Sequence, residues 1–309
     1  MNSPVKIKVI GVGGSGCNAI SRMEKYKIKG VELIAANSDY QDLKRARANV
    51  KIQIGRKITQ GLGTGMNPEI GKKAAEEQRG EIEAALKDAG MIFIACGLGG
   101  GTGSGASPVV AEIAKSLGAI TVAVVTRPFS FEGAWRQKIA QDSMNNLKDR
   151  VDSLISVSND KLLTTLNPNT TLLNAFWICD EILRQAVQSI SDLVLFPGII
   201  NVDFADVKSI LKNSGRAIFG IGRAKGEKRA EKAAMAAIES PLFDVPARGA
   251  KGVLFNISGG LDISLSEIEE AAKIITQEIN PQAKVIFGAV QDQTLPKEEI
   301  KITVIATGF

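Results

Sequence analysis

Two glycine-rich runs, each between a strand-like and a helix-like segment, constrain the fold more than any other feature. The run Lys6–Ile10 leads into Gly11–Gly16, and a helix is predicted over Cys17–Tyr26. The apolar run Met91–Ala95 leads into Gly99–Gly105, where five of seven residues are glycine. Glycine at this density destabilises a fold unless the backbone needs positive φ or a close approach. The pattern indicates strand–turn–helix units whose turns bind an anion.

Apolar strands alternate with helices through the first half of the chain. Further strands are predicted over Val31–Ala36, Ala119–Val125 and Leu154–Val157, and further helices over Glu69–Asp88, Pro108–Leu117 and Glu132–Lys148. Strands of this length that are separated by helices are typical of a parallel sheet with both faces covered. We therefore predict an α/β fold with a Rossmann-like parallel sheet.

A long helical pattern, Leu172–Leu195, divides the chain, and Pro197 and Gly198 end it. The helices predicted beyond it are Val207–Asn213, Glu227–Ser240 and Ser264–Ile279, and the strands are Ala217–Arg223, Gly252–Ser258, Lys284–Val290 and Glu299–Thr307. A chain of 309 residues exceeds what one core usually holds. We predict a first domain over residues 1–171, a connecting helix over 172–196 and a smaller α/β domain over 197–309.

Composition excludes several classes of function. The chain has no histidine, which excludes a Ser-His-Asp triad, a Cys-His pair and an HExxH metal site. Its three cysteines form no CxxC pair, and its net charge of +5 is spread along the chain. We expect reduced thiols, a mixed solvated surface and no nucleic-acid partner. No apolar run approaches the roughly 18 residues of a membrane span, so we expect a cytoplasmic protein that does not insert into membranes.

A third glycine-rich run, Gly61–Gly65, lies in a loop before the helix predicted from Glu69. Three such loops would meet at the carboxyl edge of a parallel sheet, where ligands bind. Their bare amides and hydroxyls suit several phosphates with a cation. None of the three continues into the Gly-Lys-Ser/Thr of a Walker A motif.

Two other interpretations fit part of this pattern. The first run matches GxGxxG, which alone suits a nicotinamide-dependent dehydrogenase with Asp39 on the ribose. Such an enzyme leaves the run Gly99–Gly105 unexplained. The other alternative is three unrelated flexible turns.

Five segments carry a resemblance to a known family. The run Gly99–Gly105 resembles the signature loop of the tubulin/FtsZ superfamily. The segments Val125–Gly133, Asn159–Leu163, Asn201–Val207 and Thr303–Phe309 resemble the FtsZ family in particular. The resemblance extends from Lys6 to Phe309. It implies the two-domain tubulin/FtsZ fold and a GTPase that polymerises head to tail into protofilaments, which form the cell-division ring at midcell.

The resemblance also implies roles for individual residues. The phosphates of GTP or GDP would be held by Gly13, Gly14, Ser15, Gly16, Cys17, Asn18, Gly63, Thr64, Gly65, Gly99, Gly100, Gly101, Thr102 and Gly103. Glu132 and Arg136 would hold the ribose and a nearby phosphate. Asn159 and Asp180 would read guanine, with Phe176 against the base. A carboxylate suits guanine because it accepts from both N1–H and the exocyclic amine. Core packing for Phe176 and a surface ion pair for Glu132 and Arg136 are the alternatives.

Asn201, Asp203 and Asp206 would enter the nucleotide site of the next subunit. There the two carboxylates would position or activate water, with Mg²⁺ on the phosphates. The alternative for Asp203 is a helix N-cap. A filament protein without hydrolysis is a third function, against which the two carboxylates argue.

Several residues depart from the family pattern. Ser15, Ser104 and Cys17 are unusual choices in the glycine loops, and Trp135 and Trp177 lie next to proposed ligands. The sequence ends at Phe309, without the linker and tail with which the family usually binds membrane tethers. Division-machinery and tether proteins are the partners that the resemblance implies, besides other copies of the chain.

Overall fold

The computed structural model describes residues 5–28, 30–163, 167, 169–195, 198–240, 243, 247–292 and 295–309. The chain divides into two compact units, Met1–Gln188 and Ser189–Phe309, called unit 1 and unit 2 below. This division falls inside the helix predicted as the connector. The boundaries predicted at residues 171 and 196 stay predictions.

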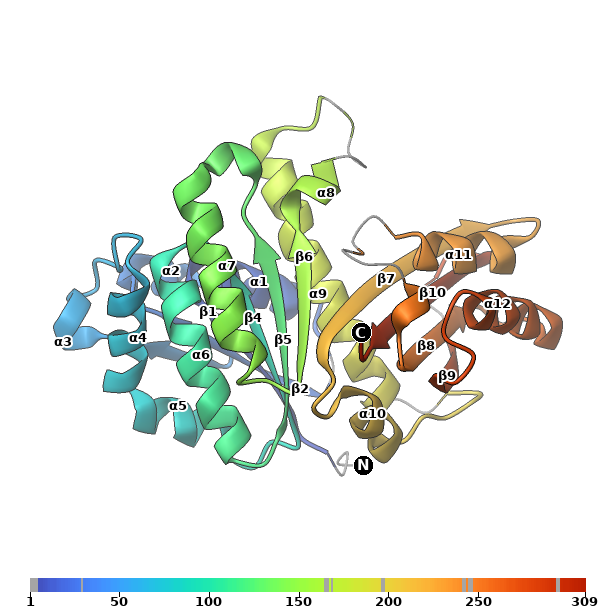
Figure 1. The fold of residues 1–309 in the computed structure, drawn as a ribbon, viewed down its shortest axis with the longest axis horizontal. Coiled ribbons are helices and arrows are strands. Elements are labelled where there is room, and N and C mark those ends of the chain that lie inside the picture. Colours follow the sequence, from blue (N-terminus) through green and yellow to red (C-terminus); the bar gives the residue numbers. More distant parts are fainter. Residues whose placement is uncertain are drawn as a thin grey trace. The chain divides into compact units, whose positions relative to one another are not determined.

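The sheet of unit 1 is parallel, in the order β3-β2-β1-β4-β5-β6 (Figure 1). Its strands are β1 (Ile7–Val12), β2 (Val31–Asn37), β3 (Val50–Gln53), β4 (Met91–Gly97), β5 (Ile120–Arg127) and β6 (Ser153–Ser158). This is the strand order of dinucleotide-binding doubly wound folds, and it reverses between β1 and β4. A ligand crevice is therefore expected at the carboxyl ends of these two strands.

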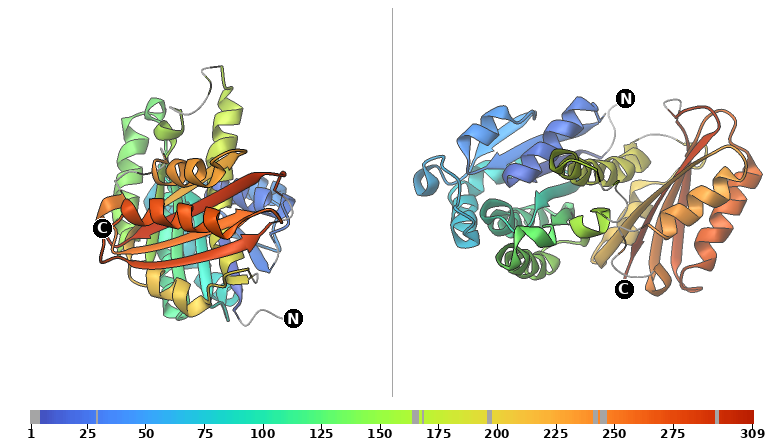
Figure 2. Two further views of the ribbon diagram at one scale, coloured as in Figure 1. Left: turned by 90° about the vertical axis from the view of Figure 1, so that its right-hand side faces the viewer. Right: turned by 90° about the horizontal axis from the view of Figure 1, so that it is seen from above.

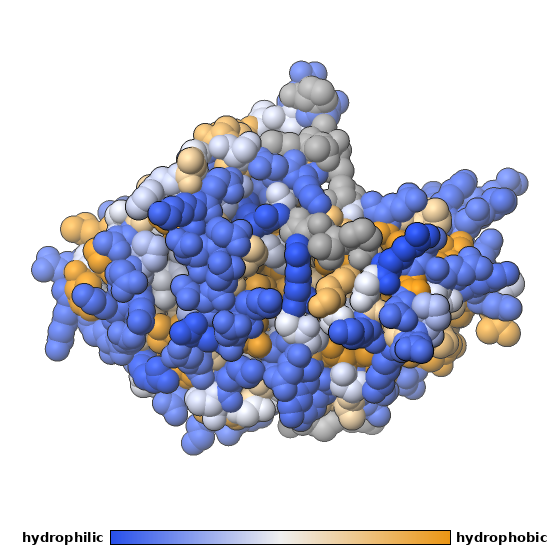
Figure 3. All heavy atoms as spheres, viewed as in Figure 1, coloured by the Kyte–Doolittle hydropathy of each residue, from blue (hydrophilic) through white to orange (hydrophobic). Residues whose placement is uncertain are grey.

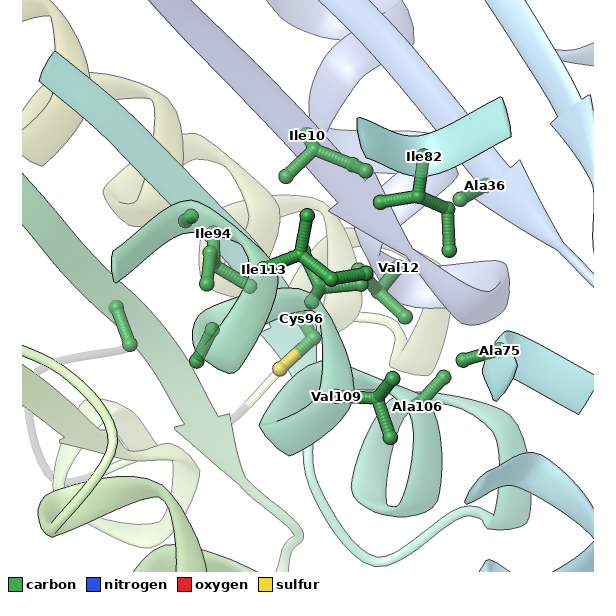
Figure 4. Close-up of a cluster of buried hydrophobic side chains, with 14 of the residues drawn as sticks. Ile10, Val12, Ala36, Ala75, Ile82, Ile94, Cys96, Ala106, Val109 and Ile113 are labelled. Carbon is green, nitrogen blue, oxygen red and sulfur yellow. The ribbon is translucent and has the colours of Figure 1, made fainter. Parts of the chain in front are cut away.

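Helices cover both faces of this sheet. They are α1 (Gly13–Lys25), α2 (Tyr40–Arg45), α3 (Arg56–Thr59), α4 (Pro68–Glu77), α5 (Arg79–Leu86), α6 (Gly101–Ser116), η1 (Ser130–Glu132), α7 (Ala134–Lys148), α8 (Asn159–Leu163) and α9 (Leu172–Leu195), whose last residues belong to unit 2. Helices α6 and α7 lie side by side on one face, while α1 lies on the other (Figure 2). Apolar side chains of β1, β4 and α6 form the core between sheet and helices (Figure 4).

Helix α6 begins at Gly101, inside the glycine-rich run, and not at Pro108 as predicted. Pro108 lies inside the helix and has no N–H to donate to the carbonyl of Ser104. The hydroxyl of Ser143 donates to that carbonyl at 2.8 Å, which satisfies it. The first helix likewise begins earlier than predicted, at Gly13. In both cases the glycine-rich run itself forms the first helical turn.

The helix predicted over Glu69–Asp88 is instead two helices, α4 and α5, which meet at Gln78. The side chain of Gln78 is buried and accepts from the backbone amide of Gly55, which fixes the break. The short elements β3, α2 and α3 were also not predicted, because their four to six residues are too few to show a periodicity.

Unit 2 contains a mixed sheet in the order β7-β10-β8-β9, in which β10 is antiparallel to both neighbours. Its strands are β7 (Gly215–Lys225), β8 (Gly252–Gly259), β9 (Lys284–Gln291) and β10 (Glu299–Thr307). Its helices are α10 (Phe204–Leu211), α11 (Arg229–Ile238), η2 (Ala247–Gly249) and α12 (Leu265–Gln277). Helices α11 and α12 contact each other on one face of this sheet (Figure 2).

No helix within the described ranges is long and apolar enough to cross a membrane. On the face drawn in Figure 3, hydrophilic residues cover most of the surface over the helices of unit 1. Pro197, which was expected to end α9, lies outside the described residues.

Candidate functional site

A cavity of about 230 Å³ opens in unit 1 at the carboxyl ends of β1 and β4. It therefore lies where the strand order reverses. The predicted site residues that line it are Gly13, Gly14, Ser15, Thr64, Gly100, Gly101, Thr102, Gly103, Glu132, Arg136, Asn159, Phe176 and Asp180. Segments far apart in the sequence meet at this one cavity, among them the starts of α1 and α6, the loop that contains Thr64, and the helices α7, α8 and α9.

Six other predicted residues do not line the cavity, namely Gly16, Cys17, Asn18, Gly63, Gly65 and Gly99. Cys17 packs against Ala35 and Leu43, and burial raises the pKa of its thiol to about 12. Asn18 is exposed. A Cβ at Gly16 would lie 2.5 Å from the carbonyl oxygen of Ala95, so this glycine lets α1 approach β4. Ligand roles for these six stay predictions.

Six lining residues were not among the predicted ligands, namely Val12, Gly97, Leu98, Thr126, Pro128 and Cys179. The first five end or closely follow the strands β1, β4 and β5. The rule that ligands bind beyond the carboxyl ends of parallel strands would have found them. Cys179 precedes Asp180 on α9, and burial raises the pKa of its thiol to about 12.

Two helices, α1 and α6, begin at the cavity without a side-chain cap on their first amides. They follow Val12 and Gly100, neither of which has a polar side chain that could cap a helix. Helices α2 and α4, by contrast, are capped by Asp39 and Asn67. Free N–H groups and the positive end of the helix dipole both favour an anion. The arrangement suits a ligand with more than one phosphate.

Hydroxyl groups connect the start of α6 to the loop that contains Thr64 and to the residue that follows β2. Oγ1 of Thr102 lies 2.7 Å from Oγ of Ser38 and 3.3 Å from Oγ1 of Thr64. Within the glycine-rich run, Ser104 accepts from the amide of Gly99 at 2.9 Å. Ser104 thus holds the loop in shape and is buried beneath it.

The glycines at the cavity serve two different purposes. Gly13 has a φ of +75°, and a Cβ there would lie 2.9 Å from the amide nitrogen of Gly103. A Cβ at Gly103 would lie 2.6 Å from the carbonyl oxygen of Gly97. These two glycines are needed for the packing of backbone on backbone. At Gly100 no described atom lies within 4 Å of the Cβ position, so this residue leaves space for a ligand.

The cavity is also lined by an aromatic ring and a buried amide. Phe176 is half exposed and packs edge to face on the buried ring of Phe129, with centroids 5.3 Å apart. Asn159 is 5% exposed, and its Oδ1 has no hydrogen-bond partner among the described residues. A buried amide oxygen without a partner is unfavourable unless a ligand satisfies it.

Asp180 is a buried carboxylate in the cavity lining, with 7% of its surface exposed. Burial raises its pKa to about 6, although Arg22 and the Ser15 hydroxyl act in the opposite direction. Nε of Arg22 lies 3.3 Å from Oδ2 of Asp180. No local sequence pattern points to Arg22, because 158 positions separate it from Asp180.

Glu132 and Arg136 form the ion pair that their spacing suggested, with 3.2 Å between Oε2 and Nη1. The second oxygen of Glu132 accepts from the backbone amide of Phe129 at 2.9 Å. Because both side chains line the cavity, the pair is also available to a ligand.

Asn201, Asp203 and Asp206 belong to unit 2. Asp203 caps α10 by accepting from the amide of Asp206 at 2.7 Å. The N-cap alternative is therefore present in the structure. Oδ1 of Asn201 accepts from the amide of Gly198 at 2.7 Å, which shapes the loop before α10.

Comparisons with known proteins identify the family. The model of the tubulin/FtsZ family GTPase domain matches residues 6–167, and that of the FtsZ family C-terminal domain matches residues 215–309. A structure titled as an empty FtsZ dimer from M. jannaschii is 45% identical, with a TM-score of 0.94, over 98% of this chain and 88% of that one. The chain belongs to the tubulin/FtsZ family. A second structure of M. jannaschii FtsZ, a point mutant, gives the same identity and TM-score and is covered to 91%.

More distant members share the fold. CetZ2 from Haloferax volcanii, in a structure titled as a GTPγS-bound protofilament, is 24% identical with a TM-score of 0.83, over 97% of this chain and 92% of that one. Membership of the family confirms the predicted α/β fold and makes the chain a GTPase that binds a guanine nucleotide. It also replaces the dehydrogenase interpretation of the first loop.

Proposed function

We propose that this GTPase assembles head to tail into cytoskeletal protofilaments in the cytoplasm and builds the cell-division ring at midcell. Its partners are then further copies of the same chain, division-machinery proteins and membrane-tether proteins. The similar structures titled as an FtsZ dimer and a CetZ2 protofilament support self-association. The observation that supports nucleotide binding is a cavity lined by the starts of two helices without a side-chain cap, together with Phe176, Asn159 and Asp180.

The amides at the starts of α1 and α6 hold the phosphates in this proposal, with Thr64 and Thr102 as hydroxyl donors. Glu132 and Arg136 bind the ribose and the nearest phosphate. Asp180 accepts from N1–H and the exocyclic amine of guanine, the unpartnered oxygen of Asn159 accepts a further base donor, and Phe176 packs against the ring.

The water-activating carboxylates come from a neighbouring subunit in this proposal. Glu132 and Asp180 are the carboxylates among the described residues that line the cavity. Glu132 is bound to Arg136 and a backbone amide, and Asp180 is assigned to the base. Asp203 and Asp206, positioned by Asn201, then orient the attacking water as the next subunit docks. Hydrolysis is thereby coupled to assembly.

Mg²⁺ is expected on the phosphates of the bound nucleotide. No group of three or more carboxylate or thiolate ligands occurs among the described residues. The hydroxyl oxygens of Thr64 and Thr102 at the cavity fit Mg²⁺, which prefers oxygen ligands, keeps several waters and takes its other ligands largely from nucleotide phosphates. These two threonines would be the residues of the chain that hold such an ion together with the nucleotide. The ion would neutralise charge that develops on the phosphates.

Nucleotide selectivity tests the base assignment. Competition of ATP and GTP for the site, measured below the assembly threshold, should favour GTP. Asp180→Ala should weaken GTP binding by about 1–3 kcal/mol, because guanine donors lose their acceptor. Equal affinity of the unmutated protein for the two nucleotides would show that the cavity does not read the base in this way.

A further inference from the structure

Arg22 lies on α1 behind the base-reading carboxylate and is not among the described residues that line the cavity. Its Nε lies 3.3 Å from Oδ2 of Asp180, with the two side chains 23% and 10% exposed. The carbon of its guanidinium lies 5.0 Å from the centroid of the Trp177 ring. Arg22 is thus held by a carboxylate and an aromatic ring from neighbouring turns of α9.

This geometry leaves Asp180 free to bind a base. An ionised carboxylate has about four acceptor positions on its two oxygens. Arg22 and the Ser15 hydroxyl, both on α1, each use one of them, which leaves acceptor positions on Asp180 in a cavity that Phe176 and Asn159 also line. The stack on Trp177 restricts the planar guanidinium, so that less freedom is lost when it binds the carboxylate.

We propose that Arg22 is a positioning residue that keeps the Asp180 carboxylate ionised and in place, so that both of its oxygens can accept from guanine. The proposal rests on the proposed guanine-reading role of Asp180. Guanine selectivity would then depend on Arg22, a residue that does not need to contact the nucleotide.

Guanine selectivity depends on whether the Asp180 carboxyl group is ionised or protonated. An ionised carboxylate offers acceptors alone, which match the N1–H and amine of guanine. A protonated carboxyl group offers one donor and one acceptor, which match the N1 and N6 positions of adenine instead. Protonation of Asp180 would therefore weaken guanine binding and remove the discrimination against adenine.

Few other groups act on Asp180. From α1, the Ser15 hydroxyl also lowers its pKa. On α9 the adjacent Cys179 thiol stays neutral, because its pKa is about 12. Across the cavity, Glu132 and Arg136 are paired with each other. Arg22 is therefore the principal charge that counteracts the effect of burial.

The test measures the affinities of GDP, IDP and ADP from pH 5.5 to 8.5, since diphosphates avoid hydrolysis. IDP keeps N1–H and lacks the exocyclic amine. In the unmutated protein GDP should bind tighter than ADP at pH 8, and this preference should fall as the pH drops through about 6. In Arg22→Gln the fall should begin about one pH unit higher, with GDP about twofold weaker at pH 7, because half of the Asp180 carboxyl groups would then be protonated. The preferences for GDP over IDP and over ADP should shrink together.

Matched variants separate charge from structure. Arg22→Lys restores a cation and should return the midpoint of the pH profile to within about half a unit of the unmutated value. Arg56→Gln removes an arginine that is also paired with a carboxylate, at 2.7 Å from Glu81, outside the cavity, and should leave the profile unchanged. Arg22→Met keeps an unbranched stem against Trp177 and provides a second neutral variant if Arg22→Gln does not fold.

The outcomes distinguish this proposal from the proposed function. If the folded neutral variants keep the unmutated pH profile, or lose GDP and ADP equally at every pH, Arg22 has no role in base reading. If the unmutated protein itself fails to prefer GDP over ADP at pH 8, Asp180 does not read guanine. The positioning role of Arg22 is then also wrong, because it depends on that reading.

Discussion

Asp203 and Asp206 cap each other at the start of α10. The amide of Asp206 donates to Oδ1 of Asp203 at 2.7 Å, and the amide of Asp203 donates to Oδ2 of Asp206 at 3.4 Å. One oxygen of each carboxylate is therefore used within the fold. The same two residues are proposed to act on water in a neighbouring subunit. An alanine variant would therefore lose the helix cap and the catalytic carboxylate together, and its effects on stability and on catalysis could not be separated.

Substitution of Asp203 by different capping residues separates these roles. Asn caps a helix about as well as Asp, whereas Ala does not, at a cost of about 1 kcal/mol. Asp203→Asn should thus keep the thermal stability of the protein and still bind GTP. Its turnover should fall by about 100-fold or more, because a water-positioning carboxylate is lost. Turnover that follows stability across Asn, Ser and Ala variants would show that the cap alone matters.

Gly100 is the position at which to disable the phosphate site without disturbing the fold. Its φ of −94° and ψ of 173° suit any residue, and no described atom lies within 4 Å of its Cβ position. Gly100→Asp should fold normally yet lose nucleotide binding, because a carboxylate would face the phosphates. The measurements are the melting temperature without nucleotide and the affinity for GTP.

Two alanine variants provide the controls for this experiment. Gly100→Ala should retain most nucleotide binding. Gly103→Ala should destabilise the protein, since its Cβ would lie 2.6 Å from the carbonyl oxygen of Gly97. A stable Gly100→Asp protein that binds GTP with unmutated affinity would place the phosphates elsewhere.

Asp180 should make the nucleotide-free protein less stable at neutral pH. Its pKa is raised from 3.8 to about 6, so the native state binds more protons than the unfolded state between these values. The free energy of unfolding therefore falls as pH rises through this window and stays lowered above it. Asp180→Asn should be more stable than the unmutated protein at pH 8, by about 1–3 kcal/mol, with no gain below pH 4.

Urea unfolding of both proteins at pH 4 and pH 8 measures this difference. Asp142→Asn, which changes an exposed carboxylate on α7, is the matched control and should have little effect at either pH. A stability difference that does not vary with pH would mean that burial does not disfavour the charged form of Asp180.

The α/β fold and most of the residues that line the cavity could be predicted from the sequence. Each glycine-rich run follows an apolar strand or precedes a clear helix, and the parallel arrangement then brings the runs to one edge. The family resemblance assigned Phe176 and Asp180 to the base, and their spacing of four agrees with it because it places both on one face of a helix. Local patterns of this kind need no knowledge of distant contacts.

Other features depend on contacts that a single sequence does not reveal. Arg22 meets Asp180 across 158 positions. Cys17 directly follows the first glycine-rich run, yet its side chain packs in a buried cluster with Ala35 and Leu43. At the break between α4 and α5 the side chain of Gln78 accepts from the amide of Gly55, and inside α6 the hydroxyl of Ser143 satisfies the carbonyl that Pro108 leaves free. Only tertiary structure separates Gly100, which faces the cavity, from Gly103, which packs on backbone.

The central claim is that each catalytic site is shared between two subunits, and GTPase activity per molecule as a function of protein concentration tests it most directly. Specific activity should be near zero below the assembly threshold and should rise above it. A mixture of Asp203→Asn, which binds GTP, and Gly100→Asp, which keeps both carboxylates, should regain part of the activity that each lacks alone. Specific activity that stays constant from well below to well above the threshold, with no recovery in the mixture, would contradict the claim.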